Sequence, residues 1–275
     1  MSAPPPRRRG RKREPKPPSE REWETSVVVE PRRAPRHPAM ISDGGGLPFP
    51  PSALDAPPAP LDPQDPAAAA LIAHLAARAG ARSPAPKRPS RAPWRRRASP
   101  EPQAATQQAA IPGVDGWRLL ARTDSEALFG RGLPPSLLTV AVRRESPRRG
   151  WIYAGSSAAR PLRAARDGIR ASSWRLDPDH EPSPDDEVLR LLLTEQSFSG
   201  GQRADSRVLA PDVYIDDDTL VLTMFVTPRP GFQWGSNNPE TPVKVALGEP
   251  VGLRRLIDGA LVRPAHSAPG DPPPA

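Results

Sequence analysis

Short apolar runs recur along the second half of the chain, and polar turn residues separate them. They lie at residues 117–121, 137–142, 151–153, 169–176, 187–194, 213–215, 220–226 and 243–247. None of these runs shows a 3.6-residue apolar period with helix caps. Short β-prone runs divided by Gly, Pro, Asn and Asp are typical of antiparallel all-β domains. We therefore predict an all-β fold, with one small antiparallel β-sandwich-like domain over residues 114–260 and a disordered tail over 261–275.

The first 110 residues lack this pattern. They hold 23 of the 42 prolines in the chain, and proline removes a backbone donor and fixes φ, which opposes both helices and sheets. We expect a long disordered arm, rich in Pro, Arg and Ala, over residues 1–110. Within it, residues 44–51 are expected to form an extended linker.

One local exception lies within the arm. Asp65 followed by Pro66 is typical of a helix N-cap and first turn, and the alanine-rich stretch that follows predicts a short helix at 66–79, with Gly80 able to end it. Leu71, Ile72 and Leu75 form an apolar stripe on that helix. Two interpretations remain open: a helix that is marginal on its own, or a helix that docks in a partner's groove.

Charge divides the chain at the same place. Residues 1–110 hold 19 Lys and Arg against 10 Asp and Glu, whereas the remaining 165 residues hold 20 against 21. A basic arm attracts polyanions such as nucleic acid, although no folded nucleic-acid motif accompanies it, and a solvated tail is the alternative. The candidate polyanion contacts are Arg7, Arg8, Arg9, Arg11, Lys12 and Arg13.

Cysteine is absent from the sequence, which excludes disulfides, thiolate zinc sites and cysteine nucleophiles. No stretch approaches the roughly 20 apolar residues of a membrane span, and no apolar segment of a signal peptide follows the N-terminal arginines. We expect a cytoplasmic protein as the sequence is written, or an exported one if the start codon is mis-assigned.

Candidate catalytic chemistry is sparse. The aspartates at 216–218 lie between two β-prone runs, where a hairpin turn is favoured over cation binding. The four histidines show no ligand spacing, and the Gly-Gly at 200–201 lacks a phosphate-binding pattern. We predict no catalytic residue, no metal site and no cofactor. An acid/base site would need Glu195, Asp212 and Asp216 to converge in a cleft with divergent pKa values.

Four segments carry a resemblance: RASSWRLDP at 170–178, LTEQSFSGGQ at 193–202, NNPETPV at 237–243 and LGEPVGLR at 247–254. Their order and spacing resemble an uncharacterised actinobacterial β-domain, found in hypothetical proteins that are often exported or lipoprotein-like. The resemblance covers about residues 150–260 and implies a β fold without an established activity. In that family the loops matching Phe198 and Trp234 commonly hold cysteines. We therefore expect these two aromatic rings to contact each other here, in place of a crosslink, and the loss of both cysteines fits a reducing compartment.

Two functions follow. The first is a non-enzymatic binding or interaction module for an unknown protein or small-molecule partner, with Phe198, Phe232 and Trp234 as its contact surface. Phe232 and Trp234 could equally plug one end of the domain. The alternative is a nucleic-acid-associated protein that is tethered through the basic arm.

Overall fold

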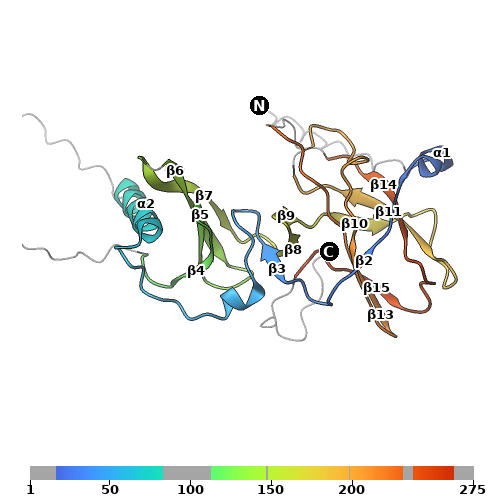
Figure 1. Ribbon diagram of the computed structural model, residues 1–275, viewed down its shortest axis with the longest axis horizontal. Helices are drawn as coiled ribbons and strands as arrows, with labels where there is room; N and C mark the ends of the chain where they lie inside the picture. The colour runs from blue at the N-terminus through green and yellow to red at the C-terminus, as the bar shows by residue number, and fades with distance from the viewer. Residues whose placement is uncertain (1–16, 83–112, 147, 198, 232–237, 263–275) are drawn as a thin grey trace, which may run out of the picture. The chain divides into compact units, whose positions relative to one another are not determined.

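A computed structural model describes residues 17–82, 113–146, 148–197, 199–231 and 238–262 (Figure 1). Strands dominate, as the sequence predicts, but the chain divides into two compact units. Unit 1 takes residues 1–37 and 171–260, and unit 2 takes residues 38–170 and 261–275. The prediction of one domain over 114–260 is therefore wrong, because a boundary at residue 170 divides it and each unit also uses residues from the N-terminal part.

Unit 1 contains two four-stranded sheets. In spatial order, the first holds β1 (Val27–Val29), β14 (Thr241–Ala246), β11 (Val188–Thr194) and β10 (Ser173–Leu176). The second holds β15 (Arg255–Asp258), β13 (Thr219–Thr223), β12 (Asp212–Ile215) and β2 (Arg32–Arg33). The apolar run at 187–194 forms the strand β11, as predicted.

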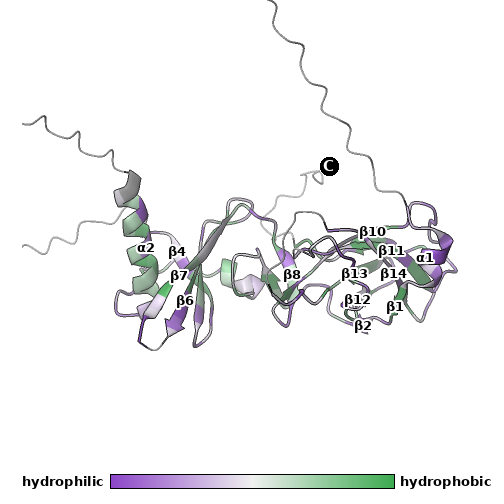
Figure 2. Ribbon diagram, turned by 90° about the horizontal axis from the view of Figure 1, so that it is seen from above, coloured by the Kyte–Doolittle hydropathy of each residue, from purple (hydrophilic) through white to green (hydrophobic). Residues whose placement is uncertain are grey.

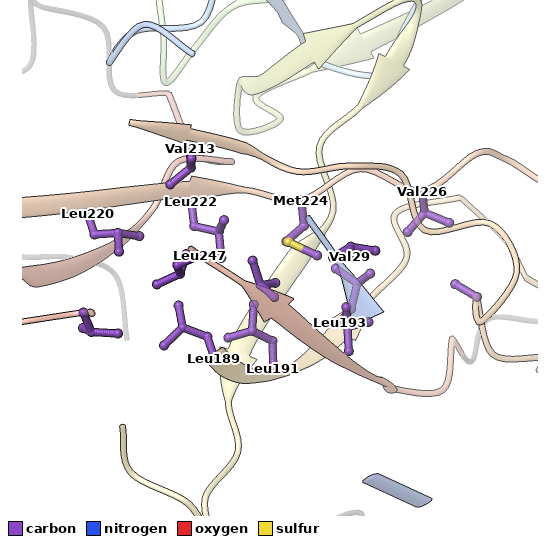
Figure 3. Close-up of a cluster of buried hydrophobic side chains, with 14 residues drawn as sticks. Val29, Leu189, Leu191, Leu193, Val213, Leu220, Leu222, Met224, Val226 and Leu247 are labelled. Carbon is purple, nitrogen blue, oxygen red and sulfur yellow. The ribbon is translucent and has the colours of Figure 1, made fainter. Parts of the chain in front are cut away.

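Both sheets of unit 1 contribute to one core (Figure 3). Leu189, Leu191 and Leu193 of β11 are fully buried in it, because alternate residues of a strand share one face. Leu220 and Leu222 enter the same core from β13 of the other sheet. The core is thus built mainly from the apolar runs visible in the sequence.

Strand directions in unit 1 are mixed. β10, β11 and β14 pair antiparallel, as do β12 and β13. In contrast, β1 pairs parallel with β14, β2 with β12, and β15 with β13. The prediction of a purely antiparallel domain is wrong at these three pairs, two of which involve N-terminal strands.

Residues 19–36 form a strap across both sheets of unit 1, so the expectation of a disordered arm is wrong for them. The strap begins with α1 (Glu20–Glu24), whose Trp23 is 1% exposed, and continues through β1 and β2. Its charges are matched to unit 1: Glu20 pairs with Arg190 at 3.0 Å, Glu22 with Arg203 at 2.7 Å, Arg33 with Glu249 at 2.5 Å, Arg36 with Asp216 at 3.8 Å, and Arg32 with Asp212. The buried indole, the strand pairing and the ion pairs together offset the conformational entropy that is lost when the strap is ordered. The high proline content had suggested that this cost would keep the segment disordered.

Unit 2 contains an antiparallel meander of β4 (Trp117–Arg122), β5 (Glu126–Arg131), β6 (Leu138–Ser146) and β7 (Gly150–Ala158). The helix α2 (Pro66–Arg82) packs on one face of it (Figures 1 and 2). Leu71 is fully buried there among apolar side chains that include Val140 and Val142. The predicted helix at 66–79 is confirmed but continues past Gly80, and its apolar stripe packs in its own chain rather than in a partner's groove.

The opposite face of the meander is covered by residues 43–54, which include the 3₁₀ helix η1 (Pro51–Leu54). Phe49 is fully buried in this layer. The loop lies flat because Gly45 and Gly46 have no side chain: a Cβ on Gly45 would lie 2.7 Å from Cβ of Ser157, and one on Gly46 would lie 2.8 Å from Cδ1 of Leu128. The expected extended linker at 44–51 is therefore a packed part of unit 2.

A small sheet of β3 (Met40–Ser42), β8 (Arg163–Arg166) and β9 (Ile169–Arg170) completes unit 2. Among the described residues, no helix has the length and apolar character needed to cross a bilayer.

Candidate binding surface

The aromatic residues predicted to form the contact surface, Phe198, Phe232 and Trp234, lie outside the described residues, and so does the proposed Phe198–Trp234 contact. The basic run from Arg7 to Arg13 also lies outside them. The residues that flank the aromatic loops are described, however. They belong to the loop that follows β11 and to the loop that precedes β14, both in unit 1.

Asn238 joins these two loops. Its side-chain oxygen accepts hydrogen bonds from the backbone N–H and the hydroxyl of Ser199, both at 3.0 Å. Its side-chain nitrogen donates to the backbone carbonyls of Glu195 and Ser197, both at 2.7 Å. An amide side chain offers two N–H groups and one oxygen with two lone pairs, so the hydrogen-bonding capacity of Asn238 is fully used. The backbone on both sides of position 198 is thereby held against position 238.

A buried ion pair lies beneath this junction. Arg207 donates to both carboxylate oxygens of Glu195, at 2.7 and 2.6 Å, and the two side chains are only 13% and 4% exposed. Arg207 also donates to the backbone carbonyl of Thr227 at 2.7 Å. One guanidinium thus ties the end of β11 to the segment that leads into the second aromatic loop.

Two further contacts brace the same region. The buried hydroxyl of Thr241, at the start of β14, accepts a hydrogen bond from the backbone N–H of Ala204 at 2.8 Å. Arg229 donates to the backbone carbonyl of Arg203 at 3.3 Å. We call the residues 195–197, 199–207, 227–231 and 238–241 the loop platform. Its backbone is crosslinked mainly by side chains rather than by strand pairing.

The three carboxylates considered for an acid/base site are each engaged by a different arginine. Glu195 pairs with Arg207 and Asp212 with Arg32, and Asp216 lies 3.8 Å from Arg36. Asp212 begins β12 and Asp216 follows its end, so about four strand residues, at roughly 3.3 Å each, separate them. The structure therefore does not bring the carboxylates of Asp212 and Asp216 together.

Asp216 begins a tight turn, as predicted. β12 and β13 form an antiparallel hairpin, and the Asp216 carboxylate accepts the backbone N–H of Asp218 at 3.0 Å. Desolvation raises the pKa of Asp216, but hydrogen bonds from the backbone of Asp218 and Thr219 outweigh it, so the pKa lies below its usual value. Within the described ranges, no three His, Asp or Glu side chains are grouped to hold a metal ion.

Sequence reasoning singled out the aromatic residues but missed Asn238 and Arg207, which hold the described residues beside them. Their hydrogen-bond partners lie 39 to 43 positions away in the chain for Asn238 and 12 to 20 positions away for Arg207, so local sequence carries no sign of these contacts. No protein-family model, curated protein or solved structure matches this chain. The case for a function therefore depends on the geometry of the loop platform.

Proposed function

We propose that unit 1 is a β-sandwich-like, non-enzymatic binding module, and that the loops carried by the loop platform form its contact surface. The observation that supports this most directly is the Asn238 junction, which joins the flanks of both aromatic loops with four hydrogen bonds. Loops held on a rigid scaffold are where binding residues concentrate. Holding them in advance reduces the conformational entropy lost on binding.

The chemistry of these loops suits recognition of a partner. The sequence places Phe198 in the first loop and Phe232 and Trp234 in the second. Aromatic side chains supply large contact area at low entropic cost and are enriched at binding hot spots. Because the Glu195 and Arg207 charges satisfy each other below the surface, we assign them a supporting role rather than one in contact with the ligand.

The test uses a displayed random-peptide library selected against the full chain. We expect enriched peptides whose binding falls at least about tenfold in W234A and F232A variants, the size of a hot-spot loss. The matched control is L253A, which removes an apolar side chain of unit 1 that is 95% exposed and lies outside the loop platform. Peptides that bind the wild type and the W234A variant equally would refute the assignment.

A second variant separates contact from support. N238A leaves the aromatic residues in place but removes the junction between the loops, so we expect weaker binding of the same peptides. Isothermal calorimetry should then show a more unfavourable entropy of binding, because the loops must be ordered by the ligand. Unchanged affinity in N238A would show that the junction does not prepare the loops for binding.

A further inference from the structure

Two successive segments of the chain, one from each unit, carry opposite charges that nearly cancel in the total of residues 111–275. Residues 113–170, which fall in unit 2, hold 11 arginines against 5 acidic residues. Residues 171–260, which fall in unit 1, hold 8 basic against 15 acidic residues. A polyanion is therefore attracted to residues 113–170 and repelled by residues 171–260, whereas residues 1–37 of unit 1 are themselves basic, with 11 basic against 5 acidic residues.

The basic charge of unit 2 is concentrated at the end of one hairpin. β6 and β7 pair antiparallel, and the end of β6 with its connection to β7 carries Arg143, Arg144, Arg148 and Arg149 and a single acidic residue, Glu145. All five side chains are exposed, and Figure 2 shows the hydrophilic character of this end of β6. We call residues 143–146, 148 and 149 the basic tip.

Three of the four arginines are free to bind a ligand. Arg149 pairs with Glu145 at 3.2 Å. Within the described part of the chain, Arg143, Arg144 and Arg148 form no ion pair and no side-chain hydrogen bond. Glu126 lies opposite Arg143 on β5 but does not pair with it.

The base of the hairpin is rigid. Val140 and Val142 of β6 are buried against α2, and Trp151 of β7 packs on the same cluster. The guanidinium of Arg122 lies 5.8 Å from the centre of the Trp151 ring and is itself held by two hydrogen bonds from its nitrogens to Asp65. The basic tip therefore extends from a packed support, which limits the backbone entropy that is lost on binding.

The arginines project from both faces of the two-stranded ribbon. Arg144 is the cross-strand partner of Trp151, and Arg143 is the partner of Ile152, so neighbouring arginines point to opposite faces. A membrane surface would contact only one face. A nucleic-acid groove presents phosphates on both sides, and the major groove of about 12 Å admits a two-stranded ribbon.

We propose that the basic tip is a binding site for duplex DNA, in which Arg143, Arg144 and Arg148 contact phosphates along a groove. Arginine suits this role because its planar guanidinium can donate two hydrogen bonds to one phosphate. The site is distinct from the loop platform of unit 1 and from the basic run at Arg7 to Arg13. It predicts sequence-independent binding that weakens with salt.

The experiment measures fluorescence anisotropy of a labelled 20-base-pair duplex with the full chain, across a series of salt concentrations. We expect R143Q/R144Q/R148Q to weaken binding at least about tenfold and to reduce the slope of log K against log salt by about 2 to 3, since each phosphate contact contributes about 0.9. R143K/R144K/R148K keeps the charge and should retain the slope. The thermal unfolding midpoint of both variants should match the wild type, because the three side chains form no ion pair or side-chain hydrogen bond with the residues that the structure describes.

The arm supplies the matched control. R7Q/R8Q/R9Q makes the same change in net charge, and the hairpin substitutions must weaken DNA binding in this background as well. The proposal is overturned if the wild type does not bind the duplex, if R7Q/R8Q/R9Q alone abolishes binding, or if R143Q/R144Q/R148Q binds within about twofold of the wild type. Loss of binding to phosphatidylserine vesicles with DNA binding retained would assign the tip to membranes instead, and would also overturn it.

Discussion

The guanidinium of Arg190 lies over the indole ring of Trp23, 5.5 Å from its centre, although 167 positions separate the two residues in the chain. Arg190 also pairs with Glu20 of the same short helix. This contact fastens the start of the strap to the outer face of a strand whose inner face lines the core. It shows that part of the proline-rich N-terminal region is needed to complete unit 1.

Trp23 therefore provides a test of the strap. W23A removes a fully buried indole, and we expect unit 1 to lose about 3–5 kcal/mol of stability. Hydrogen exchange of the β11 and β14 amides measures this within unit 1. V28A, on the adjacent strand β1 at a side chain that is 60% exposed, should change exchange little. Equal protection in W23A and wild type would contradict the packing of the strap.

The buried Glu195–Arg207 pair should be costly to break from either side. R207A leaves a carboxylate buried without its partner, and a loss of about 3–5 kcal/mol is expected. Urea unfolding followed by the same amides measures it. R175A breaks an ion pair of similar geometry with Glu240, at 2.7 Å but far more exposed, and should cost about 0–1 kcal/mol. Comparable losses in the two variants would show that burial is not the deciding factor.

Protonation of Glu22 at low pH should weaken the attachment of the strap. Its carboxylate accepts hydrogen bonds from the backbone N–H of Ser19 and from Arg203, and these lower its pKa from 4.5 to about 2. A carboxyl group whose pKa is lower in the folded state than in the unfolded state stabilises the fold at pH values above the unfolded-state pKa. This stabilisation is lost as the pH falls through the folded-state pKa. The difference in urea midpoint between wild type and E22Q should therefore be constant above pH 4.5 and should shrink between 4.5 and about 2. A difference that stays constant down to pH 2 would contradict this pairing.

Replacement of glycine by alanine should destabilise unit 2 at Gly45 and stabilise it at Gly80. G45A places a methyl group 2.7 Å from Cβ of Ser157 and 3.0 Å from Oγ1 of Thr139, and we expect a loss of about 1–3 kcal/mol from overpacking. G80A has no neighbour within 4 Å and lies inside α2, so it should gain about 0.5–1 kcal/mol from helix propensity. Thermal unfolding of both variants tests the pair. A neutral G45A would show that loop 43–46 does not lie against the sheet.

Several features could be predicted from local sequence. The leucines of β11, the hairpin turn at Asp216 and the start of α2 after Asp65 all follow from strand periodicity, turn chemistry and helix capping. These signals act over a few neighbouring residues, so one sequence is enough to detect them. The resemblance to an actinobacterial β-domain and the Phe198–Trp234 contact stay predictions.

The sequence by itself determined that the chain is mainly β-structured, where most core strands lie and that one helix precedes the meander. Only the tertiary structure decided that two units exist, that residues 19–36 strap unit 1, and that Asn238 joins the loops of the platform. Each of these depends on partners far apart in the chain: a valine triplet is stable as a strand only beside β14, and an asparagine becomes a junction only where two loops meet. Local propensity does not reveal such partners, because the free energy of these contacts arises from strand pairing and burial that exist only in the folded chain.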